Sequence, residues 1–244
     1  MGRRLDALPT VSSGRYRDHW MVSDSEAGGT VASVGKLPAI ASIAARVFRE
    51  PGDARRAVVQ LARGWWYKWW FPLRGMRFEA GRNLRASGRL HMRGPGRVVL
   101  GNNVQIDGVV TPWTYTAEAV IRIGSDSYVN GTRFGCAREI SIGSRAILAD
   151  ARILDTDFHS THIDRYDRSA PVRVAPVRLD DNVWVAAAAG ILPGTTIGRN
   201  SVVAFGAVCA GAYPEGVIIA GNPARPIGPI PGAAGTAADR DGKE

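Results

Sequence analysis

Residues 179–209 read LDDNVWVAAAAGILPGTTIGRNSVVAFGAVC, and an aliphatic or sulfur-bearing residue returns at every sixth position. The six positions are Leu179, Val185, Ile191, Ile197, Val203 and Cys209. A helix with 3.6 residues per turn would scatter these side chains around its surface, and a simple alternating strand has a period of two. A period of six predicts instead a coil with short flat faces, in which each of these side chains points into the interior.

The same step of six recurs earlier in the chain, with short insertions between the runs. The runs are Phe78, Leu84 and Leu90; Leu100 and Ile106; Ile123 and Val129; and Ile142, Leu148 and Leu154. A small or β-branched residue stands four positions after many of these residues, where we expect the chain to turn a corner: Val104, Ser127, Ala146, Val183, Ala189, Thr195, Ser201 and Ala207. Successive coils should therefore stack, with the aliphatic side chains forming continuous ladders inside.

This pattern resembles the hexapeptide-repeat acyltransferases, and the resemblance covers about residues 78–228. Gly124 and Gly143 lie 19 residues apart, which agrees with three hexads per coil. The stretches DNVWV at 181–185, ILPGTTIG at 191–198 and AGNPAR at 220–225 are similar to the closing signature of the family. The resemblance implies an all-β, left-handed parallel β-helix of hexapeptide repeats that assembles as a homotrimer.

The flanks of the repeats have a different composition. Residues 1–35 are polar and without a hydrophobic period, so we expect a flexible N-terminal arm. Residues 36–77 are expected to be a helical, basic and tryptophan-rich segment, with one amphipathic helix over 37–48 and a second from Asp53 until Pro72 stops it. The β-helix acyltransferase domain then occupies 78–228, and 229–244 is expected to be a disordered tail.

Composition and charge limit the classes of protein to consider. The 244 residues carry a net charge of +9, and all but three of the 31 basic residues are arginine. Residues 46–97 alone hold 13 basic and 3 acidic side chains. Two cysteines exclude a disulfide-stapled miniprotein, and no apolar run approaches the roughly 20 residues that span a bilayer. We expect a soluble, cytoplasmic protein.

The hexads break after Leu154, and a 22-residue excursion from Asp155 to Pro176 precedes the next one. A long insertion in a compact repeat is usually functional. In sugar O-acetyltransferases of the family a histidine on such a loop is the general base, and His159 matches it. A neutral imidazole can accept the proton of an attacking hydroxyl near physiological pH. Asp157, or alternatively Asp155, is predicted to orient the imidazole.

A second histidine opens an alternative. His162 forms a His-x-x-His pair with His159, which resembles part of the zinc site of γ-type carbonic anhydrases. A zinc site needs three or four converging ligands, and the remaining histidines, His19 and His91, do not stand where that pattern needs them. We therefore predict no metal.

The resemblance also assigns an acceptor residue and a donor site. Asn130 matches an amide in the acceptor pocket, although Asn-Gly is equally a turn signal. The donor, acetyl-CoA, is implied to lie between two subunits, with its carbonyl oxygen met by a backbone N–H after Trp184. Its contacts carry over to Ala187, Phe205, Ala210, Gly211 and Arg225. Ala186, Ala204, Phe205 and the Ala210-Gly211 pair depart from the usual residues of the family, so some phosphate contacts are lost and a bulky ring is added.

Three further predictions concern surfaces and thiols. Trp65, Trp66, Trp69 and Trp70 lie among arginines, a combination that favours peripheral contact with the inner face of a membrane. Packing of these rings against the first coils or a neighbouring subunit is an equal alternative. No recognised motif supports binding to nucleic acid. Cys209 is expected in the core, and Cys136 is undecided.

The function that follows is an acetyl-CoA-dependent O-acetyltransferase acting on a sugar hydroxyl in glycan or polysaccharide biosynthesis. An N-acetyltransferase acting on an amino sugar is a close alternative, because the same base serves an amine. A non-catalytic β-helix scaffold is the alternative from another class.

Overall fold

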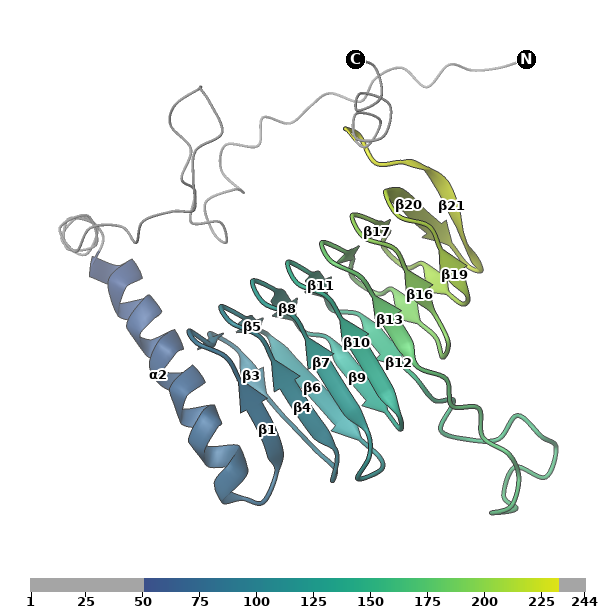
Figure 1. The fold of residues 1–244 in the computed structure, drawn as a ribbon, viewed down its shortest axis with the longest axis horizontal. Coiled ribbons are helices and arrows are strands. Elements are labelled where there is room, and N and C mark those ends of the chain that lie inside the picture. The colour runs from purple at the N-terminus through teal and green to yellow at the C-terminus, as the bar shows by residue number, and fades with distance from the viewer. Residues whose placement is uncertain (1–50, 233–244) are drawn as a thin grey trace, which may run out of the picture. The chain divides into compact units, whose positions relative to one another are not determined.

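A computed structural model describes residues 51–232 of the chain. The predicted N-terminal arm, the predicted helix over 37–48 and residues 233–244 lie outside these described residues. Between Arg77 and Pro229 the chain winds through three sheets, visiting them in turn, and one helix precedes the first strand (Figure 1). Neighbouring coils pair in parallel, and the last strand, Ala224–Pro229, turns back antiparallel to the strand before it. The predicted all-β solenoid with a helical segment before it is therefore confirmed.

Each sheet takes one strand from each of the first six coils, and the last coil adds one strand to the seven-stranded sheet and two to the eight-stranded sheet. The seven-stranded sheet contains β1 (Arg77–Ala80), β4 (Arg97–Leu100), β7 (Val120–Ile123), β10 (Glu139–Ile142), β13 (Val177–Leu179), β16 (Thr196–Ile197) and β19 (Ala212–Tyr213). The eight-stranded sheet contains β2 (Arg85–Ala86), β5 (Gln105–Asp107), β8 (Tyr128–Asn130), β11 (Ile147–Ala149), β14 (Trp184–Val185), β17 (Val202–Val203), β20 (Val217–Gly221) and β21 (Ala224–Pro229). The six-stranded sheet contains β3 (Arg89–Leu90), β6 (Val109–Thr114), β9 (Arg133–Cys136), β12 (Arg152–Leu154), β15 (Gly190–Ile191) and β18 (Val208–Cys209).

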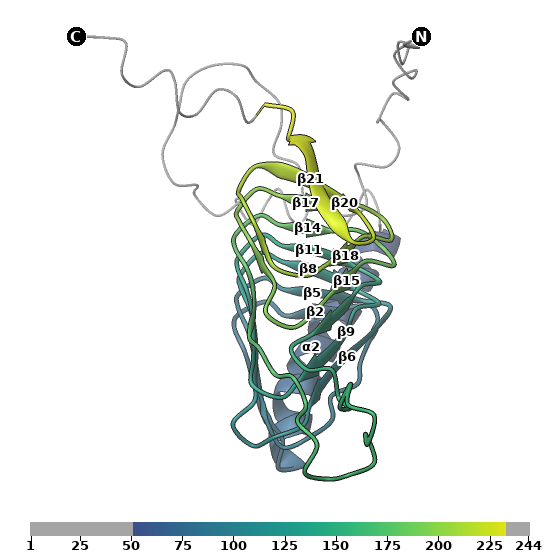
Figure 2. The ribbon, with the colours of Figure 1, turned by 90° about the vertical axis from the view of Figure 1, so that its right-hand side faces the viewer.

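The predicted interior ladders are present. All six residues of the run from Leu179 to Cys209 are at most 1% exposed, and neighbouring coils pair in the register that stacks one above the next. Figure 2 shows the strands of the eight-stranded sheet stacked in this way. The small residues at the fixed offset are also buried, and several follow a residue in the left-handed region: Asn103, Asp126, Arg145, Asn182 and Asn200. The chain therefore turns its corners where the sequence predicts.

Glycine after the aliphatic residue has a separate cause, which is the close approach of the next coil. A Cβ atom on Gly101 or Gly124 would lie 2.5 Å from backbone atoms of the following coil, and on Gly143 it would lie 2.5 Å from the Asp181 carboxylate. Only glycine fits such spacing without a shift of the backbone. The hexad glycines thus allow the coils to stack closely.

Helix α2 (Pro51–Leu73) covers the open end of the first coil. Its packed side carries Gly64, Tyr67 and Phe71, and the Phe71 ring meets Phe78 at 5.1 Å between centroids. The first coil has no preceding coil to bond, and α2 side chains supply the partners of its backbone. Arg63 Nη1 donates to the Ser87 carbonyl at 2.7 Å, Lys68 Nζ donates to the Gly81 carbonyl, and the Leu90 N–H donates to Tyr67 Oη at 3.2 Å.

The four tryptophans of α2 do not pack against the first coil. Trp65, Trp66, Trp69 and Trp70 are between 38% and 62% exposed, and their ring contacts are with one another: Trp65 with Trp69, and Trp66 with Trp70. The predicted alternative in which these rings hold the helix on the coils is therefore wrong. The physical reason is the rotation of the helix about its own axis. Gly64 lies on the side that approaches the coil most closely, and the four tryptophans lie on the other side of the helix.

The 22 residues between β12 and β13 leave the stack as a loop, at the place where the hexads break (Figure 1). Its two ends run side by side. The Ala175 N–H donates to the Asp155 carbonyl at 2.8 Å, and the Asp157 N–H donates to the Arg173 carbonyl at 3.1 Å. The loop therefore departs and returns at one corner, between the six-stranded and the seven-stranded sheet.

Candidate functional site

The base of the loop is fixed by Asp155, whose side chain is fully buried. Its carboxylate accepts hydrogen bonds from the backbone N–H groups of Ala137 at 2.6 Å and of Arg138 and Glu139 at 2.7 Å. These three donors form the turn between β9 and β10, one coil earlier. Of the two carboxylates predicted to orient His159, Asp155 is thus occupied in holding the loop to the preceding coil.

Cys136 belongs to the same anchor. Its single S–H has two acceptors within reach of the sulfur, the Asp155 carboxylate at 3.4 Å and the Val120 carbonyl at 3.5 Å. Burial, and then the neighbouring Asp155 charge, raise the pKa of the Cys136 thiol far above its usual range. Burial also raises the pKa of Cys209, to about 11. Because the thiolate is the reactive form, both cysteines have structural roles.

His159 lies three residues beyond the Thr156 bridge to Val174 and is exposed. Its backbone N–H donates to the Asp157 carbonyl at 2.7 Å, which forms a tight turn with Phe158 in the left-handed region at φ 62°. Within residues 51–232 the imidazole makes no hydrogen bond, so its orientation by the Asp157 carboxylate stays a prediction. His162 differs, because its Nδ1 accepts the Asp164 N–H at 3.3 Å.

Phe158 seats this turn on the coil, a feature that the sequence analysis missed. The ring lies over Gly135 of β9, where an added Cβ would come 2.4 Å from the ring, and it meets the Tyr115 ring at 4.9 Å between centroids. Burial raises the pKa of Tyr115 above its usual value. Glycine inside a strand is a signal of close approach, and Gly135 could have pointed to this contact. Phe158 and Gly135 together hold the backbone beside His159.

Asn130 lies at a different corner, where β8 ends and the chain turns into β9. It is half-buried, and its side-chain oxygen is placed so that a Cβ on Gly108 would lie 2.5 Å away. Its carbonyl accepts the Asp150 N–H at 2.7 Å, and Gly131 has the positive φ that the turn requires. Asn130 is thus a turn residue that also presents an amide at this corner.

A chain of polar side chains continues from Asn130 along the same corner. Asp107 is in register with Asn130, and its carboxylate accepts from Tyr128 Oη at 3.0 Å and from Ser87 Oγ at 2.6 Å. Burial, followed by the Asp107 charge, raises the pKa of Tyr128 to about 12. Tyr128 therefore stays protonated as a hydrogen-bond donor. Sequence reasoning missed this group, since its members lie in three different coils.

Asn130 and His159 stand at opposite edges of the six-stranded sheet, where an edge means the corner at which the strands begin or the corner at which they end. At about 3.3 Å per residue, the strand and corners between these edges span roughly 15 Å. Between them, Arg133 of β9 and Arg152 of β12 are exposed register neighbours, and Arg152 pairs with Asp150 at 3.3 Å. One chain thus presents the base and the amide on two separate edges.

The residues predicted to bind the donor also divide between these edges. Ala187 and Phe205 follow β14 and β17 at the corner of Asn130, where the Gly206 N–H donates to the Ala187 carbonyl at 3.1 Å. Phe205 is 76% exposed. Arg225 lies opposite Ala220 near this corner, whereas Ala210 and Gly211 follow β18 at the edge from which the loop departs. The structure does not bring the five residues into one cleft of a single chain.

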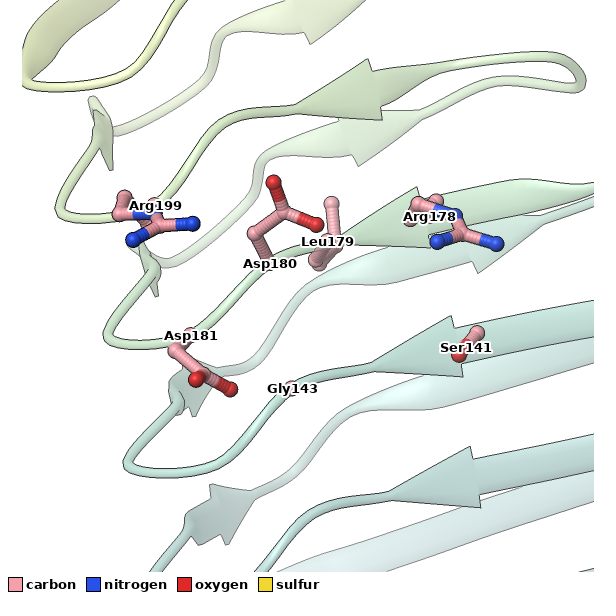
Figure 3. A pocket seen from close by; sticks show the side chains of 7 residues that line it. All are labelled: Ser141, Gly143, Arg178, Leu179, Asp180, Asp181 and Arg199. Carbon is pink, nitrogen blue, oxygen red and sulfur yellow. The ribbon is translucent and has the colours of Figure 1, made fainter.

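A polar pocket of about 270 Å³ lies elsewhere, on the corner between the seven-stranded and the eight-stranded sheet (Figure 3). Asp180 lines it and stands where the neighbouring coils have glycine, alongside Arg178, Asp181 and Arg199. Asp181 accepts the Ser144 N–H at 2.7 Å, and Arg199 pairs with Glu215 at 3.3 Å. The pocket faces away from both edges that carry the predicted site. Among residues 51–232, no three His, Cys, Asp or Glu side chains converge as metal ligands.

No family model matches the sequence, whereas individual proteins do. The chain is 29% identical over 128 residues to the putative colanic acid biosynthesis acetyltransferase WcaF of Escherichia coli, covering 51% of this chain and 65% of WcaF. It is 27% identical over 129 residues to the galactoside O-acetyltransferase of E. coli, covering 52% and 62%. A putative acetyltransferase of Saccharomyces cerevisiae is 48% identical over 52 residues, covering 21% and 26%. The chain spans less than two thirds of the length of each of these relatives.

Solved structures support the fold. The N-acyltransferase AntD of Bacillus cereus, solved as a point mutant with dTDP-4-amino-4,6-dideoxyglucose and coenzyme A, superposes with a TM-score of 0.52. It is 21% identical in sequence and is matched over 65% of this chain and 87% of its own. Similarity at this identity speaks for the architecture alone. The matched relatives carry the names of acetyltransferases, and AntD shares the solenoid architecture.

Proposed function

We propose that this chain is a hexapeptide-repeat, acetyl-CoA-dependent O-acetyltransferase that modifies a sugar hydroxyl of a glycan, polysaccharide precursor or glycolipid. The observation that carries the proposal is the loop of residues 155–176. The loop leaves the stack where the hexads break. Asp155 and Phe158 hold the start of the loop in place beside His159. An exposed imidazole on an anchored turn suits proton transfer.

His159 is the general base in this proposal. Its imidazole accepts the proton of the acceptor hydroxyl as that oxygen attacks the thioester carbonyl, and it returns the proton to the departing thiolate. A backbone N–H near Ala187 stabilises the charge that develops on the carbonyl oxygen. Asp157 is the residue proposed to orient the imidazole, since the Asp155 carboxylate is occupied by three backbone donors.

We infer that the working form is a homotrimer of left-handed coils. The base stands on one edge of the six-stranded sheet, and Asn130 stands with Ala187 and Phe205 on the other. Threefold packing sets the loop edge of one subunit against the Asn130 edge of the next, which completes a site that a single chain leaves divided. Arg225, Ala210 and Gly211 line the same groove in this arrangement.

An amino-sugar N-acetyltransferase is the second candidate, favoured by the likeness to AntD, whose structure contains an amino-sugar nucleotide. The two reactions leave different bonds. The purified protein is incubated with radiolabelled acetyl-CoA and a cell extract, and the labelled product is treated with mild alkali. We expect label in a glycan or glycolipid that alkali releases, since esters hydrolyse and amides resist.

Retention of the label after alkali would replace the O-acetyltransferase by the N-acetyltransferase. No label in any product, together with no saturable binding of acetyl-CoA by titration calorimetry, would support the non-catalytic scaffold and overturn both enzymes. Heat-treated protein serves as the control for non-enzymatic acetylation.

A further inference from the structure

Helix α2 is apolar on two opposite sides, and only one of them is used by the described chain. One side packs on the first coil through Gly64, Tyr67 and Phe71. The opposite side, named here the tryptophan face, carries residues that are 38% to 78% exposed: Val58, Val59, Trp65, Trp66, Trp69, Trp70 and Leu73. A helix on the surface of a globular protein is normally polar on the side that faces away from the core. A face of this extent on a helix end-cap indicates an interaction surface.

The tryptophan face points away from the solenoid. Contacts of α2 with β1 and β2 lie on its other side, and α2 stands at the end of the stack opposite β20 and β21 (Figure 1). The helix is held in this position by bonds to the first coil from Arg63, Lys68 and Tyr67. The exposed rings therefore lie on a fixed helix at one end of the solenoid.

The charge around the tryptophan face has one sign. Between residues 54 and 77 the sequence contains six basic residues and no acidic one. Arg63, Lys68 and Arg77 bond backbone carbonyls of the coils, and the remaining basic residues of this stretch are Arg55, Arg56 and Arg74. The Arg74 guanidinium lies 5.4 Å from the centre of the Trp70 ring, so cation and ring share one edge of the face. A second copy of such a surface would be repelled, whereas an anionic surface would be attracted.

We propose that the tryptophan face is a docking surface for an anionic lipid bilayer, with α2 lying in the plane of the interface. Tryptophan rings favour the boundary between headgroups and acyl chains, where the ring is in an apolar medium and the indole N–H finds water. Arginines at the border of the tryptophan face, such as Arg74, attract anionic headgroups. Within residues 51–232 no helix is long and apolar enough to cross a bilayer, and this mode of contact needs none.

Assembly of three subunits, as in the proposed function, would strengthen binding to the membrane. Threefold symmetry along the solenoid places all three copies of α2 at the same end, facing the same way. Three modest contacts then act together, and the bound state gains from multivalency. The docking surface itself depends only on α2, so it can be tested whether or not acetyl transfer occurs.

The test is sedimentation of the full-length protein with vesicles of phosphatidylcholine alone or of phosphatidylcholine mixed with phosphatidylglycerol. We expect the wild type to bind the mixed vesicles, and added salt to weaken the binding. The variant Trp65→Gln/Trp66→Gln/Trp69→Gln/Trp70→Gln should bind at least about tenfold more weakly. A matched control, Ile163→Gln/Tyr166→Gln, removes two side chains that are 84% and 98% exposed on the loop and should bind as the wild type does.

Circular dichroism and acetyl-CoA titration of each variant show that folding and the donor site are intact, which separates failure of this proposal from failure of the proposed function. Equal sedimentation of the wild type and the tryptophan variant would overturn the membrane proposal. So would a wild type that binds no vesicle. A change in particle mass of the tryptophan variant by light scattering would assign the face to a protein contact instead and would likewise overturn it.

Discussion

At the scale of single residues, Asp155 decides where the loop begins. One buried carboxylate holds three backbone N–H groups of the previous coil. A hydrogen bond to a charged group contributes about 1.5 to 3 kcal/mol. The residue that resembled a catalytic carboxylate in the sequence is therefore a structural anchor, and its effect on His159 is indirect.

Replacing Asp155 by Ala should lower the free energy of unfolding by about 3 kcal/mol or more, since three backbone donors lose a charged acceptor at once. Denaturant unfolding followed by circular dichroism measures the change. Asp155→Asn keeps one acceptor oxygen and should fall between the alanine variant and the wild type. Asp164→Ala, at an exposed loop position, should stay within about 0.5 kcal/mol. An unfolding midpoint of Asp155→Ala equal to that of the wild type would refute the anchor.

The sequence could not show this role, because the partners of Asp155 lie 16 to 18 residues earlier and are backbone groups. The same limit applies to Phe158, whose seat on Gly135 joins two coils. The inward ladder was predictable from the sequence, since burial at every sixth position is a local periodic property. The loop position was predictable too, because the period visibly stops at Leu154.

At the scale of elements, α2 covers the end of the first coil. The distance between the helix and the coil is limited by Gly64, where an added Cβ would lie 1.9 Å from the Leu84 carbonyl oxygen. The phase of the helix follows from this contact, and so does the exposure of the tryptophans. A glycine inside a helix is a sign of close packing, and Gly64 could have predicted which side faces the coil.

Gly64→Ala should destabilise the protein by about 1 to 3 kcal/mol, because the added methyl group pushes α2 off the coil. Helix propensity acts in the opposite direction, since alanine is favoured over glycine by about 1 kcal/mol. Gly52→Ala is the matched control in the same helix, where the nearest atom to the new Cβ is 4.0 Å away on the Arg56 side chain. Thermal unfolding compares the two, and a Gly64→Ala protein as stable as Gly52→Ala would contradict the packing account.

At the scale of the whole molecule, the proposed site is divided between two edges of one sheet. His159 leaves from the corner after β12, and Asn130 lies at the corner after β8. The sequence indicated both residues, but the strand order that separates them appears only in the fold. A site shared between neighbouring subunits reconciles the two positions.

Subunit mixing tests the shared site. Trimers of His159→Ala and trimers of Asn130→Ala should each have little activity. Unfolding and refolding them together in equal amounts should restore about one quarter of the wild-type sites. A working site needs His159 from one subunit and Asn130 from its neighbour, and each of these two residues is intact in half of the subunits. Acetyl transfer after mixing is the readout, with each variant refolded alone as the control. No gain on mixing would place both residues in the site of one subunit.

The role of His159 as the base of acetyl transfer is tested most directly by the rate of thiol release from acetyl-CoA in the presence of the glycan acceptor found by labelling. His159→Ala should lower kcat by about 100-fold or more while acetyl-CoA binding and the unfolding midpoint stay those of the wild type. His162→Ala, three residues along the same loop, should retain most of the activity. A His159→Ala enzyme that releases thiol at nearly the wild-type rate would contradict the assignment.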